Sequence, residues 1–210
     1  MRLLFVRHGE STWNLEGRFQ GQLDPLLSDL GVLQAKAVAE RIAREDKPAA
    51  IISSPLIRAR RTAELIAHAC ELPLVTDDRL CEISHGQWEG LLGTEVAKRW
   101  PAMLAQWREA PEAVHFPEGE SLADVEARLA SFLAEVEGGL SPMVVCTHDV
   151  IVRLAVLWAE GNHLDRFWDM KTENASITEI DLEGHRRTLV RRNDAAHLDG
   201  LRSDLARQAL

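Results

Sequence analysis

Cysteine is scarce in this sequence of 210 residues. The three that occur, Cys70, Cys81 and Cys146, are widely spaced and form no CxxC motif. Such a set does not provide a disulfide framework. We therefore expect reduced thiols that pack as small hydrophobic groups, as in a cytosolic protein.

Positive charge and long apolar runs are also in short supply. There are 24 Lys and Arg residues and 33 Asp and Glu residues, which gives a formal net charge of −9. This charge argues against an extended basic surface that binds nucleic acid or anionic membrane. The richest apolar run, 151–159, is interrupted by Arg153, and the first residues do not resemble a signal peptide. The sequence predicts a cytoplasmic protein that has no nucleic-acid or membrane partner.

The rest of the composition is that of an ordinary globular protein, with 46% hydrophobic and 27% charged residues. Short apolar runs predict strands at 3–6, 49–53, 142–147, 176–182 and 188–192. Amphipathic or capped stretches predict four helices. They lie at 28–45, after Ser54-Pro55 with Ser54 as the N-cap, from Ser121 to about 137 with a capping box of Ser121 and Asp124, and after His148. This alternation predicts one α/β domain over 1–210, in three layers, with a mostly parallel sheet and helices on both faces. A Trp-rich segment at about 83–120 is too long for a simple connection and is predicted to form a small helical cap over the site.

Polar residues follow three of the predicted strands. Arg7-His8 ends the first strand, residues 53–58 connect the second to a helix that carries Arg58, and Thr147-His148 ends a later strand. In sheets of this kind ligands bind beyond the carboxyl ends of the strands. Phosphoryl transfer needs fixed cations and donors around an in-line nucleophile, and two arginines and two histidines supply both. A neutral imidazole is a competent phosphoryl acceptor.

Five segments carry the motifs of the chain: RHGESTWN at 7–14, GRFQGQLD at 17–24, SSPLIRA at 53–59, EISHGQWEG at 82–90 and CTH at 146–148. Together they closely resemble the histidine phosphatase superfamily, also called phosphoglycerate mutase-like. The resemblance spans about residues 1 to 195, and it implies a metal-independent phosphomonoesterase that acts through a phosphohistidine.

The resemblance also implies a role for individual residues. His8 would be the nucleophile, Arg7, Arg58 and His148 would bind the phosphoryl oxygens, and Glu82 would carry the proton, which favours a pKa raised by burial. The residues that it places next to the substrate are Asn14, Gln20 and Gly21. Asn14 could equally be a turn residue of the loop. No metal or other cofactor is implied, and no histidine pair has the HxH or HxxxH spacing of a zinc site.

Weaker matches bear on the substrate, which is expected to be a small phosphorylated metabolite. The chain most resembles metal-independent phosphoserine phosphatases of serine biosynthesis, in which His85 and His197 would meet the substrate carboxylate; His197 could equally be an ordinary tail residue. Glucosyl-3-phosphoglycerate and broad-specificity phosphatases share much of the pattern. A phosphoglycerate mutase is less favoured, because the pocket of the mutase branch includes a tyrosine and this sequence has none. A non-catalytic binding module is the least favoured. Related enzymes are often dimers, so a homodimer is compatible with the resemblance.

One residue departs from the family pattern. Asp149 follows His148 where the family often has glycine. A carboxylate at a phosphate site would repel the substrate, so Asp149 is expected to cap the following helix and to point away from the site.

Overall fold

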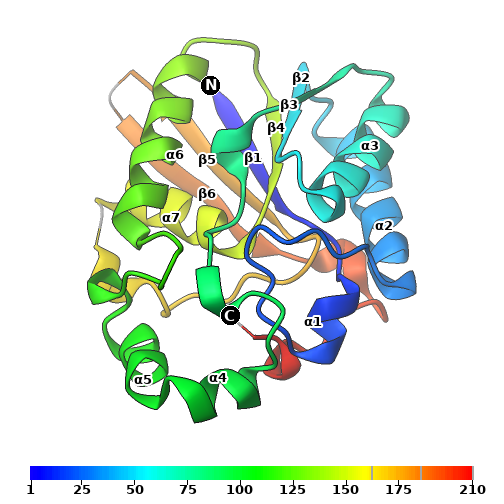
Figure 1. The fold of residues 1–210 in the computed structure, drawn as a ribbon. Coiled ribbons are helices and arrows are strands. Elements are labelled where there is room, and N and C mark those ends of the chain that lie inside the picture. Colours follow the sequence, from blue (N-terminus) through cyan, green and yellow to red (C-terminus); the bar gives the residue numbers. More distant parts are fainter. Residues whose placement is uncertain (162, 185, 210) are drawn as a thin grey trace.

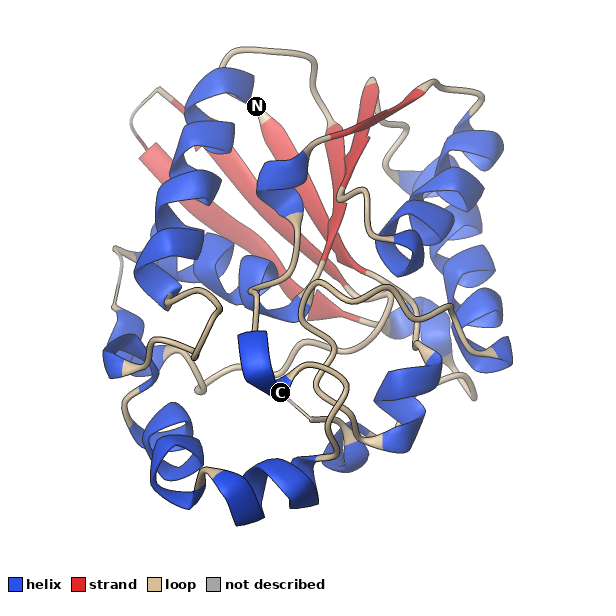
Figure 2. Cartoon of the chain, viewed as in Figure 1, coloured by secondary structure: helices blue, strands red, loops and turns tan. Residues whose placement is uncertain are grey.

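A computed structural model describes residues 1–161, 163–184 and 186–209. One six-stranded sheet forms the centre of the molecule, with helices on both of its faces (Figure 2). Its strands, in chain order, are β1 (Arg2–Arg7), β2 (Ala50–Ser53), β3 (Leu74–Thr76), β4 (Met143–Thr147), β5 (Ile177–Glu183) and β6 (Arg186–Asp194). The order across the sheet is β3-β2-β4-β1-β5-β6.

The sheet is mixed rather than uniformly parallel. β3, β2, β4 and β1 run parallel, whereas β5 and β6 run antiparallel to their neighbours. The five strands expected from the sequence are present, and the short β3 is an addition. It contains only three residues and its last two are exposed, so it has no long apolar run to reveal it.

The helices are α1 (Thr12–Glu16), α2 (Asp29–Glu45), α3 (Ile57–Cys70), α4 (Gly93–Arg99), α5 (Pro101–Glu109), α6 (Leu122–Val136) and α7 (Asp149–Glu160). Short 3-10 turns occur at Asp78–Leu80, Gly86–Trp88, Pro111–Ala113, Leu164–Arg166, Ala196–Leu198 and Leu205–Arg207. The capping box expected at Ser121 is confirmed. The cap expected at Ser54 is wrong: α3 begins two residues beyond Pro55, its N-cap is Leu56, and the Ser54 hydroxyl bonds elsewhere.

Alternate side chains of β1 lie on opposite faces of the sheet and belong to two separate clusters of the core. Leu3 and Phe5 pack in the cluster under α6 and α7, while Leu4 and Val6 pack in the cluster under α2 and α3. All four side chains are fully buried, which is why the strand reads as a continuous apolar run. Burial of this kind stabilises the fold by about 1.5 to 3 kcal/mol for each large side chain.

The segment expected as a cap contains α4 and α5, which lie beyond the carboxyl ends of β1 and β4 (Figure 1). Its tryptophans have their own small core, in which Trp88 and Trp107 contact the Phe116 ring edge-to-face at centroid distances of 4.9 and 5.0 Å. The division of the chain into one domain with this insertion stays a prediction. No helix among the described residues is long and apolar enough to cross a membrane.

Candidate active site

Strand register brings the two candidate histidines together. β1 and β4 pair in parallel with Arg7 opposite Thr147, so both strands deliver a histidine at the same edge of the sheet. The His8 backbone N–H donates to the Thr147 carbonyl at 2.9 Å, and the ring centroids of His8 and His148 lie 5.2 Å apart. Both side chains are buried.

The His8 ring is fixed through its Nδ1 atom, which lies 2.6 Å from the Gly9 carbonyl oxygen. A carbonyl oxygen only accepts, so Nδ1 carries the proton and Nε2 keeps its lone pair. Burial, and after it the charges of Arg58 and Arg7, hold the pKa of His8 well below its ordinary value. The ring is therefore neutral at physiological pH, with Nε2 able to act as a nucleophile.

Two buried arginines flank this ring. Arg7 donates through Nη1 to the Thr172 carbonyl at 2.5 Å, and Arg58 donates to the carbonyls of Leu23 and Gly21 at 2.9 and 2.8 Å. Their Nε atoms have no partner among the described residues. Burial lowers the pKa of Arg58 to about 10, which leaves it charged at neutral pH. Two such cations make a site for an anion.

Gly21 supplies one of these carbonyls from a left-handed backbone, with a φ of +50°. A Cβ atom at this position would stand 2.0 Å from Oε1 of Glu89. Glycine is thus required both by the conformation and by the close approach of Glu89.

Glu82 lies in the same region and is buried. Its Oε1 atom accepts from the backbone N–H groups of Ile83 and Val150, at 3.0 and 3.3 Å. Burial, with a contribution from the charge of Asp149, raises the pKa of Glu82 to about 7. A carboxyl group with this pKa can both give and take a proton at neutral pH.

Ser54 sets the orientation of His148. Its Oγ atom lies 2.8 Å from Nε2 of His148 and also accepts from the Leu56 N–H at 3.3 Å. The hydroxyl also lies 3.9 Å from Sγ of Cys81, to which it can donate, so the contact with Nε2 holds the His148 ring without setting its tautomer. The Nδ1 atom of His148 is buried and has no partner among the described residues. Ser54 belongs to the SSPLIRA motif, but its hydroxyl was expected to cap a helix and not to contact His148.

Asn14 and Gln20 both lie in the loop structure around α1. Asn14 closes a capping box with Ser11 through Oδ1 and directs Nδ2 toward Oε1 of Gln208, at 3.2 Å. Gln20 is buried and accepts from the Ser11 hydroxyl at 2.7 Å. Asn14 therefore holds its loop and still presents a donor.

His85 is buried among aromatic rings. Its ring centroid lies 5.2 Å from that of Phe19 and 4.8 Å from that of Phe116. Burial lowers the pKa of His85 to about 3, so the ring is neutral. Neither ring nitrogen has a partner among the described residues, which leaves one donor and one acceptor unused.

His197 does not join this group. Its Nε2 lies 2.9 Å from the Ala175 carbonyl oxygen and its Nδ1 lies 3.2 Å from Nη1 of Arg41. Both ring nitrogens are thus occupied by the protein. These contacts give no support to the substrate-binding role that the resemblance implied for His197.

Asp149 corrects an expectation, because it neither caps α7 through its side chain nor points away from the site. The N-cap is His148, and the buried Asp149 carboxylate bonds Arg153 at 2.7 Å and the Thr172 hydroxyl. Its Oδ1 atom also stands 3.7 Å from Nη1 of Arg7. Both oxygens are occupied by cations or donors, which offsets their repulsion of a bound anion. Arg153, one helical turn later, was the available signal.

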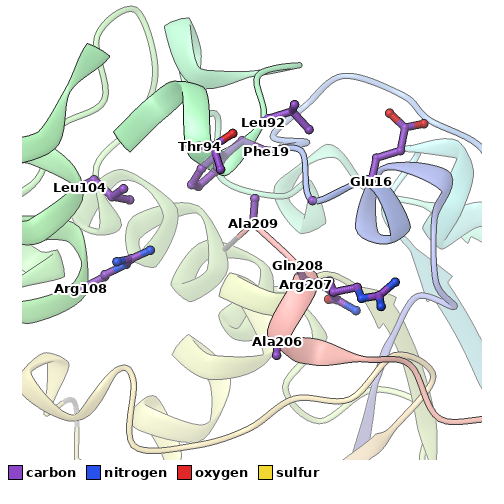
Figure 3. Close-up of a pocket in the computed structure, with 12 residues that line it drawn as sticks. Glu16, Phe19, Leu92, Thr94, Leu104, Arg108, Ala206, Arg207, Gln208 and Ala209 are labelled. Atoms are coloured by element: carbon purple, nitrogen blue, oxygen red, sulfur yellow. The ribbon is translucent and has the colours of Figure 1, made fainter. Parts of the chain in front are cut away.

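The C-terminal tail adds a residue that sequence reasoning missed. Gln208 accepts from Nη2 of Arg7 at 2.6 Å and donates to Oδ1 of Asn174 at 2.7 Å. It also lines a cavity of about 440 Å³ between the tail and the cap, together with Phe19 and Leu104 (Figure 3). Among the described residues, no three metal-ligating side chains gather closely enough to hold a metal ion.

Comparisons with known proteins give this geometry a family. The model of the histidine phosphatase superfamily (branch 1) matches residues 3–195. Phosphoserine phosphatase 1 of Hydrogenobacter thermophilus is 41% identical over 200 residues, which cover 94% of each chain. A Yersinia pestis protein named "Probable phosphoglycerate mutase GpmB" is 33% identical over 87% of this chain and 86% of its own.

A solved structure of a phosphatase has the same fold as this chain. The mycobacterial glucosyl-3-phosphoglycerate phosphatase superposes with a TM-score of 0.85 and 31% identity, over 92% of this chain and 99% of its own. The family match, the relatives and the fold point in one direction. The chain belongs to the histidine phosphatase superfamily and is a phosphatase.

Proposed function

We propose that the protein transfers the phosphoryl group of a small phosphomonoester onto Nε2 of His8 and then hydrolyses the phosphohistidine. The observation that carries this proposal is the His8 ring, whose Nδ1 proton is held by the Gly9 carbonyl while Nε2 is free. A neutral imidazole fixed in this tautomer has its nucleophilic lone pair ready.

Charge neutralisation comes from the groups around His8. Arg7 and Arg58 are buried cations, and the His148 ring, whose Nδ1 has no partner among the described residues, lies at the end of the neighbouring strand. The charge of a transferred phosphoryl group is spread over its oxygens, so preorganised cations and donors stabilise its transition state. No step requires a metal.

Glu82 completes the proton balance. In the first step Nε2 of His8 bonds to phosphorus, the bond from phosphorus to the ester oxygen breaks, and Glu82 gives its proton to the leaving alkoxide. In the second step water attacks phosphorus and passes a proton to Glu82, and the phosphorus–nitrogen bond breaks to release inorganic phosphate. A pKa of about 7 keeps about half of the Glu82 carboxyl groups protonated at pH 7.

Phosphoserine is the substrate that we propose. The similarity to Phosphoserine phosphatase 1 over nearly the whole chain supports it. His85, three residues after Glu82, adds a neutral ring whose N–H has no acceptor among the described residues and suits a substrate carboxylate. The main alternative is glucosyl-3-phosphoglycerate, because the mycobacterial phosphatase of that name has the same fold.

A substrate panel tests this choice. The kcat/KM values of phosphoserine, phosphothreonine, 3-phosphoglycerate, glucosyl-3-phosphoglycerate and p-nitrophenyl phosphate should be measured with EDTA present. Phosphoserine is expected to give the highest value, and EDTA is expected to have no effect. A higher value for glucosyl-3-phosphoglycerate would replace phosphoserine as the substrate, and loss of activity in EDTA would contradict the metal-independent mechanism.

A further inference from the structure

The chain returns to the site after its last strand. β6 ends level with the carboxyl end of β1, and residues 195–209 continue from there to α1 (Figure 1). Gln34 of α2 anchors this tail by donating to the Leu201 carbonyl at 2.7 Å and to the Ser203 hydroxyl at 2.9 Å. The end of the tail therefore reaches the site from a fixed point.

At the end of the tail, the side chain of Gln208 bonds three residues of the site. Its Oε1 atom accepts from Nη2 of Arg7 at 2.6 Å and from Nδ2 of Asn14 at 3.2 Å. Its Nε2 atom donates to Oδ1 of Asn174 at 2.7 Å, and Nδ2 of Asn174 donates to the His8 carbonyl at 3.1 Å. One carboxamide oxygen thus takes one donor each from Arg7 and Asn14.

Arg7 and Asn14 are also residues that the family resemblance places at the phosphoryl group. A carboxamide oxygen accepts in the same manner as a phosphoryl oxygen but carries no full charge. We propose that Gln208 is a built-in competitor of the phosphoryl group, which occupies Arg7 and Asn14 until a phosphomonoester displaces it. The inference rests on the proposed function, because it takes Arg7 as a ligand of the phosphoryl oxygens.

Displacement requires only a local movement. Gln208 borders the cavity of about 440 Å³ between tail and cap, so its side chain has space beside it (Figure 3). Gln34 holds the tail at Leu201 and Ser203, several residues before Gln208, and these hydrogen bonds do not involve the Gln208 side chain. The Arg7–Gln208 bond already has an ionised donor, but a phosphate dianion adds a full negative charge and can pair with the guanidinium through two parallel hydrogen bonds, so the dianion wins over the carboxamide. A weakly charged ligand does not have that advantage.

The binding of inorganic phosphate tests the competition. Isothermal titration calorimetry at pH 7.5 should compare wild type with Gln208→Ala, and Gln106→Ala on the exposed face of α5 serves as the matched control. If Gln208 is bonded to Arg7 and Asn14 in about nine tenths of the unliganded molecules, Gln208→Ala should lower the apparent Kd for phosphate about tenfold, or about 1.4 kcal/mol. Gln208→Glu should raise it, because a carboxylate pairs with Arg7. Gln106→Ala should match wild type.

The opposite sign would overturn the proposal. A higher phosphate Kd in Gln208→Ala would make Gln208 a ligand of the phosphate, and an unchanged Kd would make it a structural contact. Arg7→Ala separates this outcome from a failure of the proposed function. If Arg7→Ala binds phosphate as wild type does, Arg7 is not a phosphate ligand and the site assignment itself fails.

Discussion

Replacement of Glu82 by glutamine should separate substrates according to their leaving groups. The variant keeps the size of the side chain and an oxygen for the N–H groups of Ile83 and Val150, but it has no proton to give. The serine alkoxide is a strong base and leaves only with a proton, whereas p-nitrophenolate leaves without one. The effect should therefore fall on phosphoserine.

The magnitude follows from the pKa of Glu82. With a pKa of about 7, about half of the carboxyl groups carry the proton at pH 7, so wild type has about half of its full general-acid activity there. General acids contribute about 100- to 10,000-fold. Glu82→Gln should lower kcat/KM for phosphoserine by about that factor, and for p-nitrophenyl phosphate by less than about tenfold.

The assay is steady-state hydrolysis of both substrates at pH 7, with phosphate release as the readout. Glu112→Gln, an exposed glutamate of the cap, is the control and should match wild type on both substrates. Equal losses of kcat/KM on the two substrates in Glu82→Gln would refute the reasoning, because kcat/KM reports the transfer to His8, and equal losses there would show that Glu82 acts through structure or charge alone.

Three further outcomes follow from the same contacts. The pKa of Glu82 is about 7 in the folded protein against an ordinary 4.5, so its carboxyl group stabilises the fold fully below pH 4.5 and loses this contribution as the pH rises through 7. The free energy of unfolding of Glu82→Gln minus that of wild type, measured in urea, should therefore increase by about 3 kcal/mol from pH 4.5 to 8. A difference that stays constant with pH would contradict this. His85→Ala should raise KM for phosphoserine by the equivalent of about 1.5 to 3 kcal/mol and spare p-nitrophenyl phosphate, whereas a uniform loss would make His85 a packing residue. With 2,3-bisphosphoglycerate as primer, 3-phosphoglycerate should show little isomerisation, and conversion to 2-phosphoglycerate faster than hydrolysis would indicate a mutase.

The sequence predicted the parts of the site that depend on local pattern. Arg7, His8 and His148 follow apolar runs that form buried strands, and the parallel pairing of those strands places their ends together. The family motifs named the same residues and Glu82. The order of the strands and the antiparallel pairing of β5 with β1 carry no comparable signal, because they depend on contacts between segments that are distant in the sequence.

Other features of the site depend on tertiary contacts that no local pattern encodes. Gln208 meets Arg7 across 201 positions of the chain, in a tail without a motif. The neutral state of His85 follows from its burial among aromatic rings, which the spacing from Glu82 does not reveal. Asp149 was expected to point away because a carboxylate beside a phosphate would repel it, and its ion pair with Arg153, which offsets that repulsion, was not foreseen.

The most direct test of the central claim is the chemical fate of His8 during turnover. Wild type should be mixed with ³²P-labelled phosphoserine, quenched with base within milliseconds and digested for mass spectrometry. We predict a base-stable, acid-labile phosphoryl group on His8, and none in His8→Ala, which should also be inactive. Label that persists undiminished in His8→Ala, or that maps to another residue in wild type, would contradict the account.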